Sequence, residues 1–182
     1  MSYDVYLTSR KNLEKERGEA DVLNPGPASP ATEERKRALS ERLMAENPEL
    51  QPYPFGYAEI ARIDGISEAE ARERYRHIEL DGKDDGNGIQ ITIFDDHVDI
   101  TVPYWHAGAA AQSTFEEIWR YLRIIEREMG YVTYDGQLDK LLDLSGDFAA
   151  VVARYEGVVA QMPEILASVE SQRKRKPWWK FW

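Results

Sequence analysis

Residues 88–105, GIQITIFDDHVDITVPYW, read as a β-hairpin whose two-residue turn is Asp95 and Asp96. Apolar and polar residues alternate on both sides of that turn, as they do in strands with one buried face. The expected cross-strand pairs are Phe94 with His97, Ile93 with Val98, Thr92 with Asp99, Ile91 with Ile100, Gln90 with Thr101 and Ile89 with Val102. A slip of one residue would place Ile93 opposite Asp99 and mix the two faces. The apolar pattern therefore predicts both the hairpin and its register.

Helix and strand patterns lie on both sides of the hairpin. Ser29 before Pro30 is typical of a helix start, and Ser67 and Ser113 are each followed three residues later by a glutamate, which is the capping-box pattern. The expected helices are residues 30–47, 57–63, 67–76 and 113–129, the last ended by Gly130. The expected further strands are residues 2–9, 77–80 and 131–134, and residues 10–28 read as a loop.

This order of elements predicts an α+β fold with a ferredoxin-like split βαβ sheet. The expected α+β domain is residues 1–144, with a helical insertion at about residues 48–76. A C-terminal helical segment, residues 145–172, should pack on the sheet or on another copy of the chain. Gly157 and Pro163 indicate a break in it or two shorter helices. Residues 173–182 form a basic aromatic tail.

Charge is distributed unevenly along the 182 residues. The net charge is −10, but the last ten residues hold five basic groups and no acid, so residues 1–172 carry 18 basic against 33 acidic residues, or −15. Such a body disfavours nucleic acid and favours a basic protein partner. The chain has no cysteine and opens without an apolar signal segment. We therefore expect a cytoplasmic protein.

Acidic side chains gather around the hairpin turn. Asp84 and Asp85 precede the hairpin, and Asp95, Asp96 and Asp99 surround its turn. Oxygen-rich clusters suit hard cations, but no spacing here matches an EF-hand or a two-histidine site. We predict no metal and no cofactor, and we expect these aspartates to form a partner-binding surface.

Two further motifs carry residues that can take part in catalysis or in DNA binding. His106, in PYWHAGA, follows a strand and could act as a general base, but no nucleophile accompanies it, so we predict no enzyme activity and group His106 with the partner-binding residues. Residues 57–76 resemble a helix-turn-helix. Its second helix offers Arg72, Arg74 and Arg76 beside three glutamates, a balance that opposes phosphate binding. A helical pair without DNA contact is therefore expected.

The C-terminal tail combines positive charge with aromatic rings. Its residues with expected function are Arg173, Lys174, Arg175, Lys176, Trp178, Trp179, Lys180, Phe181 and Trp182. Aromatic rings settle at membrane interfaces, and each basic residue near anionic lipid adds about 1 kcal/mol of binding free energy. The tail is thus expected to bind a membrane surface, to dock in a groove of a partner, or to fold back on the acidic body.

The segments SYDVYL, ITIFDD, VDITVPYW and GYVTYDGQ resemble a group of small bacterial proteins with an SYDxYL or SYDxYF opening and a YDPQ strand exit. Gly136 stands where that group usually has proline. Some members of the group resemble immunity proteins, which neutralise toxins delivered by neighbouring cells. The resemblance implies a non-enzymatic binding protein, an immunity or antitoxin-like inhibitor. The alternatives are an adaptor that acts through the tail at a membrane or a partner, and a helix-turn-helix regulator.

Overall fold

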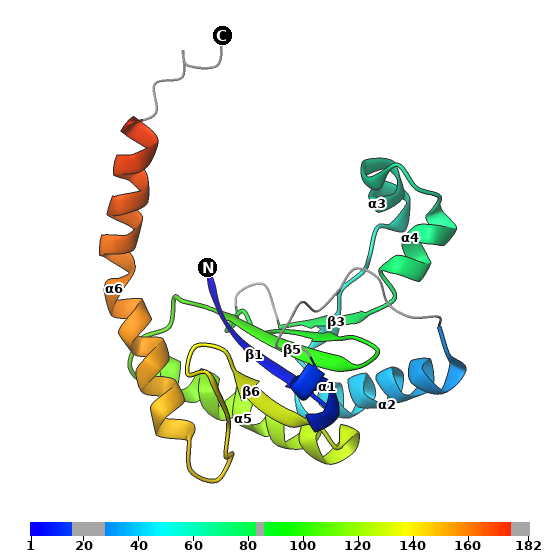
Figure 1. Ribbon diagram of the computed structural model, residues 1–182, viewed down its shortest axis with the longest axis horizontal. Helices are drawn as coiled ribbons and strands as arrows, with labels where there is room; N and C mark the ends of the chain where they lie inside the picture. The colour runs from blue at the N-terminus through cyan, green and yellow to red at the C-terminus, as the bar shows by residue number, and fades with distance from the viewer. Residues whose placement is uncertain (16–27, 83–85, 176–182) are drawn as a thin grey trace.

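The computed structural model describes the backbone of residues 1–15, 28–82 and 86–175, and their side chains except those of residues 15 and 167–175 (Figure 1). One antiparallel sheet organises this part of the chain. Its seven strands lie in the order β2 (Gln51–Pro52), β3 (Ile78–Asp81), β4 (Gln90–Ile93), β5 (His97–Pro103), β1 (Ser2–Thr8), β6 (Val132–Asp135) and β7 (Lys140–Leu141). The six helices of these residues are α1 (Arg10–Lys15), α2 (Pro30–Glu46), α3 (Tyr57–Asp64), α4 (Glu68–Arg74), α5 (Ala109–Met129) and α6 (Phe148–Arg175).

The predicted hairpin is confirmed with its register. Gln90 pairs with Thr101, and Ile93 pairs with Val98. The Phe94 backbone N–H donates to the His97 carbonyl at 2.9 Å, which closes the turn over Asp95 and Asp96. The apolar residues of both strands are fully buried on one face. The mixed α and β composition is therefore confirmed, and the sheet is open at both edges.

The ferredoxin-like arrangement is not confirmed, because the seven strands of the sheet do not follow the ferredoxin-like order. The five expected strands, β3, β4, β5, β1 and β6, are neighbours, which confirms the strand expected at residues 77–80, but the sheet continues beyond them. At one edge β2 is added, where Gln51 pairs with Asp81. At the other edge β7 is added, where Lys140 pairs with Asp135. Strands of two residues carry too little alternation to be recognised from sequence.

Helix boundaries were correct where a cap decided them. Ser29 caps α2, Ser67 and Glu70 form the predicted capping box of α4, and Gly130 ends α5 in a left-handed conformation with φ 65°. The capping box at Ser113 was wrong: α5 begins at Ala109, since alanines favour helix, and the Ser113 hydroxyl donates to the Ala110 carbonyl instead.

Two other expectations on helices differ from the structure. Residues 10–15 form the short helix α1, not a loop. α6 continues through Gly157 and Pro163 as one helix. Pro163 removes one backbone donor, but it lies on an exposed stretch where solvent replaces the lost partner. Among the described residues, no helix has the length and apolar character that crossing a membrane requires.

The two faces of the sheet differ. α5 contacts β1 and β6, α2 contacts β3, and α2 and α5 together cover one face. α3 and α4 stand on the other side, and α6 leaves the sheet past one edge and extends away from it (Figure 1). Between α6 and the α3–α4 pair, no helix of the described residues covers this face. This part is called the open face below, and it is uncovered in that sense.

Tyr3 occupies the centre of the covered face. Its ring makes edge contacts with Tyr104, Phe115 and Tyr155, at centroid distances of 5.6 to 6.2 Å. Its hydroxyl donates a hydrogen bond to the buried Asp135 carboxyl group. Burial and then this hydrogen bond raise the pKa of Tyr3 far above its ordinary value.

We predict that Tyr3→Phe lowers the free energy of unfolding by about 1–3 kcal/mol, because the buried Asp135 carboxyl group loses a donor. Urea denaturation followed by circular dichroism measures this change. Tyr134→Phe is the matched control, since that ring is only half-buried, and it should change stability by less than about 0.5 kcal/mol. Equal effects of the two changes would contradict the role given to Tyr3.

Candidate functional site

Strand pairing builds the open face from rows of side chains. One row runs directly across the sheet through Glu79, Thr92, Asp99, Tyr6 and Tyr134. The next row follows the same strands through Asp81, Gln90, Thr101 and Asp4. Because alternate residues of a strand share a face, the acidic residues of β1, β3 and β5 all project to the uncovered side. The open face is therefore acidic across several strands.

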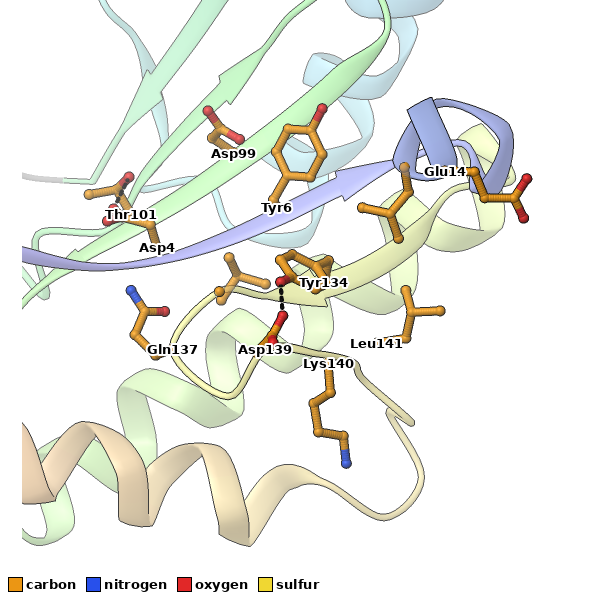
Figure 2. A pocket seen from close by; sticks show the side chains of 13 residues that line it. Asp4, Tyr6, Glu14, Asp99, Thr101, Tyr134, Gln137, Asp139, Lys140 and Leu141 are labelled. Atoms are coloured by element: carbon orange, nitrogen blue, oxygen red, sulfur yellow. Dashed lines mark hydrogen bonds between the residues drawn. The ribbon is translucent and has the colours of Figure 1, made fainter. Parts of the chain in front are cut away.

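A groove of about 930 Å³ lies on this face, over β5, β1, β6 and β7. α1 bounds it on one side and the turn before β7 on the other (Figure 2). Its polar lining includes four carboxylates and one lysine, which are Asp4, Glu14, Asp99, Asp139 and Lys140. Its larger apolar lining residues are Tyr6, Leu13, Tyr134 and Leu141. We call this set of residues the acidic groove.

Hydrogen bonds hold several of these carboxylates in place. Asp4 accepts from the Thr101 hydroxyl at 2.9 Å, and Asp139 accepts from the Tyr134 hydroxyl at 2.5 Å (Figure 2). Asp139 has a left-handed backbone with φ 50°, a conformation that Asp and Asn tolerate better than most residues. Lys140, in turn, pairs with Asp147 at 2.8 Å. The groove thus presents fixed negative charge beside two tyrosine rings, an arrangement that suits lysine or arginine side chains.

Asp95, one of the expected partner-binding residues, lies in a buried ion cluster. The fully buried Lys36 ammonium contacts Asp95 and Glu33, each at 2.8 Å, and the Arg76 guanidinium also pairs with Asp95. Burial opposes ionisation of Asp95, but hydrogen bonds from Arg76 and Lys36 outweigh it and lower the pKa of this carboxyl group. The cluster joins the hairpin turn to α2 and to the end of the α3–α4 insertion.

The other expected residues lie apart from one another. Asp96 pairs with the His97 ring at 2.8 Å, and that ring stacks on Phe94 at a centroid distance of 4.2 Å. Only Asp99 lies in the acidic groove. His106 lies against the loop before β4, where its Nε2 atom is 2.6 Å from the Asn87 carbonyl oxygen. Asp84 and Asp85 lie outside the described residues, and their role stays a prediction.

The side chains of the tail also lie outside the part of the chain that the structure describes. Arg173, Lys174 and Arg175 belong to the last turn of α6, and the remaining tail residues, Lys176, Trp178, Trp179, Lys180, Phe181 and Trp182, follow it. Groups of three or more His, Asp or Glu side chains placed to hold a metal ion do not occur in the described residues.

The arginines of the α3–α4 pair already have partners. Arg72 pairs with Glu68 at 2.6 Å and lies over the Tyr57 ring, and Arg74 lies 3.8 Å from Asp64. Arg76 belongs to the buried ion cluster. Pairing with carboxylates reduces the charge that such a helix offers to phosphates.

Comparison with models of protein families, with curated proteins and with solved structures finds no match to this chain. The resemblance to immunity proteins therefore stays a prediction.

Sequence reasoning missed most of the acidic groove. Asp4 and Tyr6 alternate with buried residues on β1, and that alternation was a usable signal for an acidic exposed face. Glu14 and Asp139 had no such signal, because they come from a short helix and a turn whose neighbours in space are distant in sequence.

We predict that Asp95→Asn lowers the free energy of unfolding by about 2–4 kcal/mol, because two buried cations lose one of the two anions that they share, while Asp95 itself keeps 22% exposure. The advantage of the wild type should be complete above about pH 4, the ordinary range of an unfolded aspartate, and should disappear as the pH falls through the lower folded pKa. Urea unfolding between pH 2.5 and pH 7 measures both. Glu41→Gln, on the exposed side of α2, is the control and should leave the profile unchanged. An Asp95→Asn variant as stable as wild type at pH 7 would contradict this assignment.

Proposed function

We propose that this chain is a non-enzymatic protein-binding module whose acidic groove takes a basic segment of another protein. The observation that carries the proposal is the gathering of four carboxylates and two tyrosines in one groove on an uncovered sheet face. The proposed class is an immunity or antitoxin-like inhibitor, in agreement with the motifs of the first and last long strands.

The charge of the groove suits this role. Among the described residues that line it, Lys140 is the one cation, and that side chain is already paired with Asp147. Negative surfaces of this kind accelerate association with basic partners and confer specificity. The aromatic rings add contact area that stays rigid on binding, which reduces the entropy cost.

The same features favour a segment of protein over a small anion or a nucleic acid. Phosphates would meet the carboxylates of Asp4, Asp99 and Asp139, and the described lining offers no unpaired cation to offset them. The groove is also wide enough for several side chains, because about 930 Å³ is at the upper end of the range for drug-sized ligands.

We predict that Asp99→Asn with Asp139→Asn, the groove variant, slows association with the partner about three- to tenfold at low salt, and less at high salt. The candidate partner is the protein encoded beside this gene, purified and measured by stopped-flow fluorescence. In cells, the groove variant should protect less well against that protein's toxicity.

The matched control is Glu34→Gln with Glu41→Gln, which removes the same charge from the exposed side of α2, on the opposite side of the sheet. This variant should associate at nearly the wild-type rate. Equal rates for wild type and groove variant at low salt would overturn the proposed use of the groove, and an inert neighbouring protein would remove the inhibitor class.

A second function is supported by the course of α6. The buried residues of this helix are Val151, Val152 and Tyr155, all in its first turns, and the described side chains beyond them are exposed or half-buried. The helix then extends away from the sheet (Figure 1). The last described turn of α6, which leads into the basic aromatic tail, therefore lies away from the sheet, and this suits an adaptor that docks the protein on an anionic membrane.

For the adaptor, we predict that the full chain sediments with phosphatidylserine vesicles and not with phosphatidylcholine vesicles. The tail variant, with Trp178, Trp179, Phe181 and Trp182 each changed to Ser, should stay in the supernatant, because its aromatic rings no longer enter the interface. No sedimentation of the intact chain would exclude this second function.

A further inference from the structure

The two most unusual parts of the chain have opposite chemistry. The acidic groove offers carboxylates and tyrosine rings, and the tail RKRKPWWKFW offers five basic groups and four aromatic rings. We propose that the tail of one copy docks in the acidic groove of a second copy, so that the free protein is a dimer by reciprocal exchange of tails. This inference rests on the proposed function only in taking the groove as a receptor for basic segments.

The lining of the groove matches both halves of the tail's chemistry. Asp4, Asp99 and Asp139 provide acceptors for lysine and arginine donors, and the Tyr6 and Tyr134 rings provide faces for cations. Leu13 and Leu141 provide apolar contacts for tryptophan, and Leu141 is 37% exposed without a ligand. Docking would remove from water the aromatic rings that otherwise favour aggregation.

Charge distinguishes the tail from the other chain segment that could cover the groove. Residues 16–27 follow α1, whose residues line the groove, but they carry three acids against one base. Residues 173–182 carry five bases and no acid. An acidic groove should therefore repel the first segment and attract the second.

The length of α6 bears on whether the tail docks in the groove of its own copy or in that of a second copy. The Tyr155 hydroxyl donates to the Pro103 carbonyl at 2.5 Å, and Pro103 pairs with Ser2, so Tyr155 marks the level of the sheet. At about 1.5 Å per residue, the helix carries Arg175 roughly 30 Å beyond that level. Residues 176–182, fully extended, span at most about 25 Å. Since α6 leads away from the sheet (Figure 1), this geometry favours the groove of a second copy over that of the same copy.

Reciprocal docking closes the assembly. Two copies related by a two-fold axis would each give a tail and each receive one, which satisfies both grooves without leaving a site for a third copy. Any basic partner of the groove must then displace the tail. Binding of that partner and dimerisation are consequently competing equilibria of one site.

Sedimentation velocity on the full chain at low and high salt tests the exchange. We expect a dimer for wild type at 50 mM salt that weakens at 500 mM, because the contact is ionic. The groove variant and the tail variant should each be monomers, with the dimer dissociation constant raised about tenfold or more. The Glu34→Gln, Glu41→Gln control should dimerise like wild type.

A mixture of the groove variant with the tail variant distinguishes exchange from other contacts. The first has an intact tail and the second an intact groove, so the mixture should form a heterodimer that neither variant forms alone. A labelled peptide of sequence RKRKPWWKFW should likewise bind the tail variant, and should lose that binding when Asp99→Asn and Asp139→Asn are added to it.

The outcomes separate this inference from the proposed function. A monomeric wild type, a dimer that survives in the groove variant, or a mixture without heterodimer would each overturn the exchange of tails. A monomeric wild type whose partner binding is still lost in the groove variant would overturn only the exchange. Dimerisation lost in the groove variant with unchanged partner binding would support the exchange and overturn the proposed use of the groove.

Discussion

The hydrogen bond from Tyr3 to Asp135 connects residues that are 132 positions apart and links the core to the wall of the acidic groove. Tyr3 lies in the ring cluster formed by α5, α6 and β1, so this bond adds a side-chain contact to the backbone pairing of β1 with β6. Asp135 also accepts the backbone N–H groups of Gln137 and Leu138, at 2.8 and 2.9 Å. A carboxyl group buried in the core thereby shapes the turn that forms one wall of the acidic groove.

This interaction joins the SYDVYL and GYVTYDGQ segments, which lie on the neighbouring strands β1 and β6. Tyr3 is the tyrosine of SYD, and Asp135 is the aspartate of the strand exit YDGQ. The turn uses the N–H groups of residues 137 and 138, and Gly136 does not take a positive φ. A proline at position 136 would leave both of these hydrogen bonds in place. The two motifs thus describe one structural constraint.

Local patterns predicted the elements, and long-range pairing produced the site. The hairpin register and the caps at Ser67 and Gly130 depend on neighbours in sequence, and they were predicted correctly, whereas the capping box expected at Ser113 was wrong. The acidic groove combines segments from β1, α1, β5, β6 and the turn before β7, and the order of those strands is not a local property. The hairpin-turn aspartates looked equivalent in sequence. In the structure, Asp95 pairs with the buried Lys36, whereas strand alternation turns Asp99 into the acidic groove.

These two aspartates have different surroundings. Asp95 faces buried cations, so its charge is compensated and contributes to folding. Asp99 and the other carboxylates of the groove line a surface that no helix of the described residues covers. A cationic segment that binds there stabilises the folded chain by mass action, because it binds the folded state and not the unfolded one. In the proposed role, the groove carboxylates therefore serve the recognition of a basic segment, whichever molecule supplies it, and Asp95 serves the fold.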